Sequence, residues 1–178
     1  MKLSSFNSNN IEEIKQLFTK TFSDSEGESE GLLVGNLAYD LMINVDDQDY
    51  YCFVASEKDL IVGSIIFSRL KFETEVNAFL LSPVAVDTSY QGKGIGQKLI
   101  RYGLKILKEK KVELVFTYGD PNFYSKVGFN IISEKLIKAP FKLSYPEGWL
   151  VQSLLGYEIK PIKGNLFCVE AFNNPELW

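Results

Sequence analysis

Apolar residues in the first third of the chain recur at the spacing of helices. Between residues 11 and 22 they fall every three or four positions, which predicts one amphipathic helix. Asn10 and Glu13 have the spacing of a capping box at its start. A second helix is predicted where leucines again share a face: Leu33, Leu37 and Leu41. The polar stretch between them, residues 23–31, is predicted to be an acidic loop.

From residue 50 the pattern becomes that of strands. Runs rich in β-branched and aromatic residues predict strands at 50–56, 60–72 and 78–86, and the first two form a hairpin through the turn at 57–59. Pro83 lies inside the third run. Because proline has no N–H to donate, we expect this strand to lie at an edge of the sheet or to be bulged there.

The second half alternates helices with strands. A turn rich in glycine precedes a strong helix that runs to about residue 110. Asp120 and Pro121 begin a short helix, which Gly128 ends. Further strands are predicted at three places: residues 112–118, 129–132 and 167–172. Residues 133–165 give no clear pattern. The order, which opens with a short strand, predicts one mixed α/β domain over residues 1–178.

Composition excludes several classes of protein. The chain has no histidine, so it has no Ser-His-Asp or Cys-His catalytic system and lacks the commonest transition-metal ligand. A net charge of −4 argues against nucleic-acid binding. Cys52 and Cys168 lie in apolar runs, which predicts buried thiols in a reducing compartment. No signal peptide or membrane span is evident, so we expect a cytoplasmic protein without a metal.

The segment from Leu81 to Gly96 carries the clearest chemistry. A strand ends, glycines follow at alternate positions, and a helix begins, which together suit a phosphate at the helix N-terminus. A Rossmann fingerprint fails because Gln97 stands at its last glycine, and a P-loop sequence is absent. Gln91, Gly94 and Gly96 match the Gln/Arg-x-x-Gly-x-Gly/Ala loop of the GNAT acetyltransferases.

A second segment strengthens this resemblance. Residues 119–129 resemble the second cofactor motif of the GNAT family, with its Phe-Tyr-x-x-x-Gly-Phe signature, and the layout is similar to that of bacterial YhbS-like N-acetyltransferases. The resemblance implies the GNAT fold: a central, mostly antiparallel mixed sheet with splayed fourth and fifth strands, flanked by helices. It also implies acetyl-CoA as acyl donor, with cofactor contacts from Val84, Ala85, Val86, Gln91, Gly92, Lys93, Gly94, Ile95, Gly96, Gln97, Lys98, Asn122 and Tyr124.

Catalysis is expected to be direct attack of a primary amine on the thioester. Tyr124 is the predicted acid that protonates the departing thiolate. The resemblance aligns Leu80 with the glutamate that serves many relatives as base, and leucine cannot titrate. Glu73, Glu75 and a water held by Ser82 or by strand carbonyls therefore remain alternatives for the base. A backbone N–H near Val84 is expected to polarise the carbonyl.

Other assignments stay open at this point. The same fold could hold coenzyme A as a sensor without turnover, whereas a dinucleotide oxidoreductase is disfavoured by the failed glycine pattern. The acidic residues Asp24, Glu26, Glu28 and Glu30 could attract an amine, although such charge runs are more often solvated loops. The acceptor, a small molecule or a peptide, is not identified. Trp178 is expected to be exposed, which leaves a homodimer open.

Overall fold

The computed structural model describes residues 1–178 and contains one mixed sheet of eight strands. The strand order is β1-β2-β3-β4-β5-β7-β6, and β8 pairs with β3. The strands are β1 (Lys2–Ser5), β2 (Tyr50–Glu57), β3 (Leu60–Phe72), β4 (Ala78–Val86), β5 (Leu114–Tyr118), β6 (Asn130–Ile131), β7 (Trp149–Ser153) and β8 (Leu166–Cys168). The helices are α1 (Ile11–Glu26), α2 (Glu28–Asn44), α3 (Ile95–Glu109) and α4 (Pro121–Tyr124). The predicted mixed α/β class is confirmed.

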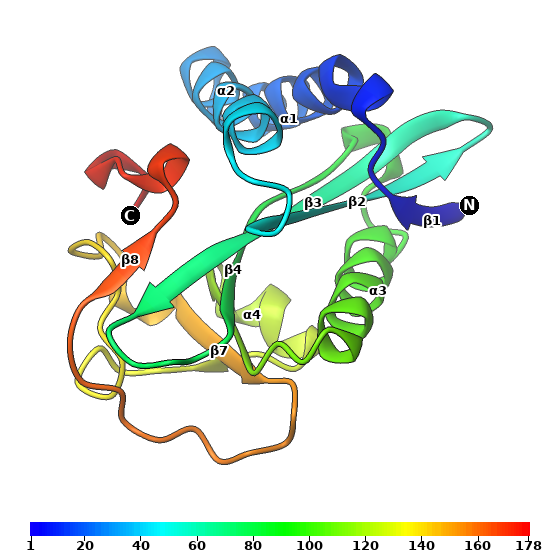
Figure 1. The fold of residues 1–178 in the computed structure, drawn as a ribbon. Helices are drawn as coiled ribbons and strands as arrows, with labels where there is room; N and C mark the ends of the chain where they lie inside the picture. The colour runs from blue at the N-terminus through cyan, green and yellow to red at the C-terminus, as the bar shows by residue number, and fades with distance from the viewer. The chain divides into compact units, whose positions relative to one another are not determined.

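The chain divides into two compact units. The first comprises residues 1–67 and 82–103, and the second comprises residues 68–81 and 104–178. The first unit holds β1 and β2 as an antiparallel pair, in which Leu3 lies opposite Ala55. It also holds α1 and α2, which lie side by side (Figure 1). Gly35 of α2 lies directly against Thr19 of α1, so a side chain at residue 35 would collide with the neighbouring helix.

Two predictions about the first helices are wrong. Residues 23–31 do not form a loop, because α1 and α2 are separated by Gly27 alone, whose φ of 101° turns the chain. Asn10 makes no side-chain cap. Instead, Glu13 accepts the backbone N–H of Ile61 at 2.9 Å and so joins α1 to the start of β3. The Asn10 side chain donates to the other carboxylate oxygen of Glu13 at 3.5 Å, so the two residues meet without forming a capping box.

The second unit contains the parallel pair of the sheet. Residues 78–81 of β4 pair with residues 114–117 of β5, and β7 runs antiparallel to β5. β4 has neighbours on both sides in the strand order, so it is not an edge strand, the first of the two alternatives expected from Pro83. Its pairing with β5 ends at Leu81, two residues before Pro83, and the Ser82–Pro83 peptide is cis. β7 lies within residues 133–165, for which no element was predicted. Its first residue, Trp149, is fully buried and donates its indole N–H to the carbonyl of Ile137 at 3.0 Å.

Trp178 is buried, which corrects the expectation that it is exposed. Its side chain is 4% exposed and donates its indole N–H to the carbonyl of Phe172 at 3.1 Å. Its ring also packs against Tyr118 and Trp149, with ring centres 6.2 and 6.1 Å away. The feature that suggested a homodimer contact is therefore part of the core.

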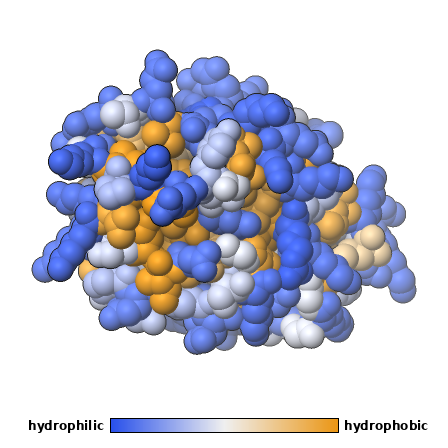
Figure 2. Space-filling model, turned by 90° about the horizontal axis from the view of Figure 1, so that it is seen from below, coloured by the Kyte–Doolittle hydropathy of each residue, from blue (hydrophilic) through white to orange (hydrophobic).

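On the face shown in Figure 2, apolar side chains reach the surface in patches separated by charged and polar residues. None of the helices combines the length and the apolar character needed to cross a membrane. Both cysteines are free, Cys52 buried in β2 and Cys168 half-buried in β8.

Candidate functional site

The turn after β4 is built by side chains that hold its own backbone. Asp87 accepts the N–H of Ser89 at 2.9 Å, which caps a short 3₁₀ turn over Thr88–Tyr90. Gln91 then folds back and donates its amide to the carbonyl of Val86 at 2.9 Å. Gly92 follows with a φ of 74°, a conformation that side-chain-bearing residues rarely adopt. The loop is thus preformed by local hydrogen bonds and by glycine.

Gly94 ends this loop and begins α3. Its φ is also 74°, and the space beside its α-carbon is open. The carbonyl of Gly94 accepts the N–H of Lys98 at 3.1 Å, which is the first bond of the helix. The N–H groups of residues 95–97 precede this bond and so have no acceptor within the helix. Free N–H groups, the helix dipole and open space beside glycine together favour a bound phosphate.

Two predicted lysines flank the loop. The ammonium of Lys93 is held locally, because it donates to the carbonyl of Ser89 at 3.2 Å and lies 4.9 Å from the centre of the Tyr90 ring. Lys98 is exposed on the first turn of α3. Both can add positive charge near the N-terminus of the helix, although Lys93 would have to leave its present partners to reach a ligand.

The backbone of β4 presents alternate residues to its two sides. Asp87 donates its N–H to the carbonyl of Val62 on β3 at 2.9 Å. Because backbone polar groups alternate along a strand, those of Ala85 also face β3, and those of Val84 and Val86 face away from it. The carbonyl of Val86 is already taken by Gln91. Val84 therefore keeps both of its polar groups directed away from β3, whereas Ala85 is engaged by the sheet.

A cluster not predicted from the sequence connects α1 to this turn. Lys20 pairs with Asp24 at 2.8 Å and with Asp87 at 3.7 Å, and Thr88 donates to Asp24 at 2.6 Å. These hydrogen bonds and charges raise the pKa of Lys20 and lower that of Asp24. Asp24 is therefore bound within the protein, which weakens its predicted role in attracting an amine. The i, i+4 spacing of Lys20 and Asp24 is the feature of the sequence that could have indicated this cluster.

Tyr124 is the centre of a second group, in the second unit. The ring is in edge contact with Phe123 and Phe129, with ring centres 5.1 and 5.8 Å away. A β-carbon at Gly119 would lie 2.8 Å from the edge of this ring, so glycine is required where the ring meets the end of β5. Burial raises the pKa of the Tyr124 phenol, whose hydrogen-bond partner is Thr117. The phenol is thus protonated at neutral pH and able to donate.

The turn that carries Tyr124 is stabilised as the sequence predicts. Asp120 accepts the N–H of Asn122 at 2.9 Å, Pro121 occupies the first turn, and Gly128 ends the following turn with a φ of 96°. The Asn122 side chain is exposed beside Tyr124 in the sequence and is free to meet a ligand.

The structure does not bring the predicted glutamates to Tyr124. Glu73 and Glu75 lie in the connection before β4, whereas Thr117, the partner of Tyr124, lies opposite Leu81 farther along that strand. Glu73 is already engaged by the backbone and side-chain N–H groups of Asn165, at 3.1 and 3.2 Å. Leu80 is buried, and Ser82 directly follows Leu81 with an intermediate exposure.

No cluster of three or more metal-ligating side chains is present. The acidic residues Asp46, Asp47 and Asp49 form a turn after α2, closed by the bond from the N–H of Asp49 to the carbonyl of Asp46 at 2.8 Å.

Comparison with known proteins shows which proteins this chain resembles. Residues 48–131 match the acetyltransferase (GNAT) domain. The uncharacterized N-acetyltransferase YjhQ of Escherichia coli K12 is 31% identical over 115 residues, which cover 61% of this chain and 63% of YjhQ. The uncharacterized N-acetyltransferase YhbS of the same strain is 29% identical over 107 residues, covering 60% of this chain and 61% of YhbS. The alignments thus span less than two thirds of these relatives.

Solved structures show the same fold. YhbS from Escherichia coli, solved in complex with CoA, has a TM-score of 0.80 at 22% identity over 97% of this chain and 92% of YhbS. A GNAT family acetyltransferase from Brucella melitensis, solved with acetyl-CoA, has a TM-score of 0.75 at 22% identity over 96% of this chain and 97% of that protein. Residues 48–131 are therefore similar to the acetyltransferase (GNAT) domain, and the chain as a whole has the fold of these solved structures.

Proposed function

We propose that this protein transfers the acetyl group of acetyl-CoA to a primary amine of a small molecule or peptide. The observation that carries the proposal is the turn from Gln91 to Gly96, whose glycines open onto the unpaired N–H groups of a helix within a GNAT domain. The YhbS and Brucella melitensis proteins, solved with CoA and acetyl-CoA, support the choice of cofactor. We propose that residues 1–178 act as one acetyltransferase domain.

Cofactor binding would use the turn and the strand before it. Backbone N–H groups of residues 92–97 and the charge of Lys98 would hold the pyrophosphate. The backbone of Val84, which faces away from β3, would pair with the pantetheine arm, and its N–H is the candidate to polarise the thioester carbonyl. Val86 can offer only its N–H while Gln91 occupies its carbonyl. Ala85 would contribute packing, because its polar groups face the sheet.

The reaction would proceed by direct attack in a ternary complex. The amine nitrogen bonds to the carbonyl carbon, the carbon–sulfur bond breaks, and the electron pair leaves on sulfur as the coenzyme A thiolate. Tyr124 would donate its phenolic proton to that thiolate, and Asn122 would lie beside the same end of the cofactor. The support for Tyr124 is its raised pKa, which keeps the proton available at neutral pH.

The amine must lose a proton before it attacks. Deprotonating a lysine-like amine at pH 7 costs about 4–5 kcal/mol, since it requires roughly three and a half pKa units at 1.36 kcal/mol each. A water held by Ser82 and by strand carbonyls is our preferred route for this proton. Glu75 is less suitable, because its connection precedes β4 while Ser82 follows the segment paired to β5.

Release of free thiol from acetyl-CoA across a panel of amines tests this proposal. We expect turnover with at least one amine, and a drop of about 100-fold in kcat for Tyr124→Phe with little change in acetyl-CoA affinity. Tyr145→Phe, which alters an exposed phenol in the same unit, should behave as the wild type. If acetyl-CoA binds tightly but no amine of the panel causes release of its thiol, the result would instead support a coenzyme A sensor.

A further inference from the structure

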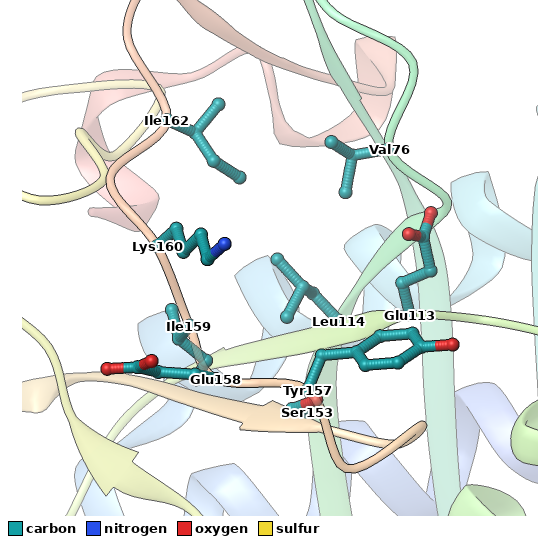
Figure 3. Close-up of a pocket in the computed structure, with 9 residues that line it drawn as sticks. All are labelled: Val76, Glu113, Leu114, Ser153, Tyr157, Glu158, Ile159, Lys160 and Ile162. Atoms are coloured by element: carbon teal, nitrogen blue, oxygen red, sulfur yellow. The ribbon is translucent and has the colours of Figure 1, made fainter.

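A cavity of about 480 Å³ lies in the second unit, at the amino end of β5 (Figure 3). Four apolar side chains line it: Val76, Leu114, Ile159 and Ile162. Cavities that bind small molecules are commonly about 300–1,000 Å³ in volume and mostly apolar. The size and the lining of this cavity are therefore those of a small-molecule site.

The segment that closes one side of the cavity is tied to the rest of the unit. Ile162 donates its N–H to the carbonyl of Leu136 at 3.0 Å and forms a parallel bridge with the buried Ile137. On the other side of the segment, Leu154 donates its N–H to the carbonyl of Glu113 at 2.9 Å. Backbone hydrogen bonds thus hold the segment that forms this wall at both of its ends, so the cavity is preformed.

One of the three charged residues that line the cavity, Lys160, is positive and points into it. Figure 3 shows the ammonium of Lys160 pointing inward, toward Leu114, and the carboxylate of Glu158 pointing away. Lys160 is exposed and forms no ion pair, since no carboxylate oxygen lies within 4.0 Å of its nitrogen. The carboxylate of Glu113, which also borders the cavity, is engaged by the backbone N–H of Asn77 at 2.7 Å. Lys160 is therefore the group of the lining that can pair with an anion.

We propose that this cavity binds a small amphipathic carboxylate. Its carboxylate would pair with the ammonium of Lys160, and its alkyl or aryl tail would lie against Leu114, Ile159 and Ile162. The single positive charge of Lys160 balances the one negative charge of a carboxylate, whereas a phosphate group carries a charge of about −1.5 to −2 at neutral pH.

This site is separate from the proposed catalytic group. Leu114 borders the cavity, whereas Thr117 meets Tyr124 three residues later on the same strand, about 10 Å away at roughly 3.3 Å per residue. The inference does not depend on acetyl transfer, and binding can be measured without turnover.

The test uses octanoate and the uncharged octan-1-ol as probes, titrated into the full chain by ligand-observed NMR. We expect octanoate to bind more tightly than octan-1-ol. Lys160→Met keeps the apolar stem and removes the charge, so it should weaken octanoate binding about tenfold and leave octan-1-ol binding unchanged. Lys163→Met is the matched control, because Lys163 is exposed nearby and does not line the cavity; it should bind both probes as the wild type does.

Three results would overturn the inference. The folded wild type could fail to bind octanoate at millimolar concentration. Lys160→Met could bind octanoate as well as the wild type, or Lys163→Met could weaken it equally, which would indicate unspecific attraction to surface charge. Inorganic phosphate could compete with octanoate at equal concentration, which would show that the apolar tail contributes nothing. Circular dichroism of each variant establishes that it is folded.

Discussion

Thr117 donates its hydroxyl proton to the carbonyl oxygen of Leu81 across 2.8 Å, and both residues are fully buried. The two lie opposite each other in the parallel pairing of β4 with β5. Because the hydroxyl proton of Thr117 is used in this bond, its oxygen can only accept a hydrogen bond from Tyr124. The proton of the phenol is therefore directed at Thr117 before any ligand binds.

Replacing Thr117 with valine should impair catalysis by Tyr124. Thr117 accepts the phenolic proton and so orients the phenol, and valine has no oxygen to do this. We expect kcat, measured as release of thiol from acetyl-CoA, to fall while acetyl-CoA affinity is kept. An unchanged kcat would contradict the link between the two residues.

The same variant should also lose stability. Valine leaves the buried carbonyl of Leu81 without its partner, which typically costs about 1–3 kcal/mol. Urea denaturation measures this loss, and Thr117→Ser, which retains the hydroxyl, should recover both the stability and kcat in large part.

Replacing Gly119 with alanine should displace Tyr124. The new methyl group would lie 2.8 Å from the ring edge, closer than carbon atoms can approach, so the ring must move. We expect kcat to fall while acetyl-CoA binding is kept. In a double-mutant cycle with Tyr124→Phe, the two effects on kcat should be far from additive. Additive effects would show that Gly119 does not act through the tyrosine.

Replacing Gly103 with alanine should destabilise the first unit, although alanine favours a helix. By helix propensity alone, the change from glycine to alanine would stabilise the helix by about 1 kcal/mol. The added methyl group, however, would lie 2.7 Å from the ring of Phe67 and 3.0 Å from that of Phe53, both fully buried. Overpacking of this kind costs about 1–3 kcal/mol. Thermal unfolding should show a lower Tm, whereas Lys108→Ala on the exposed face should have little effect; a higher Tm for Gly103→Ala would refute this packing.

Cys52 should make the fold sensitive to alkali. Burial raises the pKa of its thiol from 9.0 to about 12. The unfolded thiol loses its proton above pH 9, whereas the folded thiol does not, so stability is complete below pH 9 and is lost as pH rises toward 12. Three pKa units correspond to about 4 kcal/mol. The free energy of unfolding is measured between pH 9 and 12 for the wild type and for Cys52→Val. All other groups titrate equally in the two proteins, so the difference between their pH profiles reports the contribution of the Cys52 thiol. Parallel pH profiles would show that the thiol makes no such contribution.

The sequence predicted those elements whose signals are local. The hairpin at 50–72, the strand around Pro83 and the cap at Asp120 follow from residue type and spacing, and the structure confirms them as β2–β3, β4 and the start of α4. β7 was missed because its position depends on pairing with β5 and on burial of Trp149, which no local pattern reveals. The helices α1 and α2 were predicted to be farther apart because a polar stretch suggests a loop, whereas one glycine suffices for the turn.

The candidate site, too, was predicted only in those features that have a local signal in the sequence. The glycines of the turn at 92–94 were predicted from the motif, since a positive φ demands glycine. The bond from Gln91 to Val86 and the support of Tyr124 by Thr117 were not predicted. Both depend on side chains that meet only after the strands are in register. The acidic residue Asp24 was given a ligand-facing role because its partners Lys20 and Thr88 lie on separate segments of the chain.

Calorimetric titration of acetyl-CoA into the wild type, Gly94→Asp and Gly94→Asn tests the central claim most directly. Asparagine and aspartate have the same shape, and both tolerate a positive φ, so they differ only in charge at the proposed pyrophosphate site. We predict micromolar binding by the wild type, moderately weaker binding by Gly94→Asn and no detectable binding by Gly94→Asp. Absence of binding by the folded wild type, or equal binding by both variants, would contradict the assignment of this turn to the cofactor.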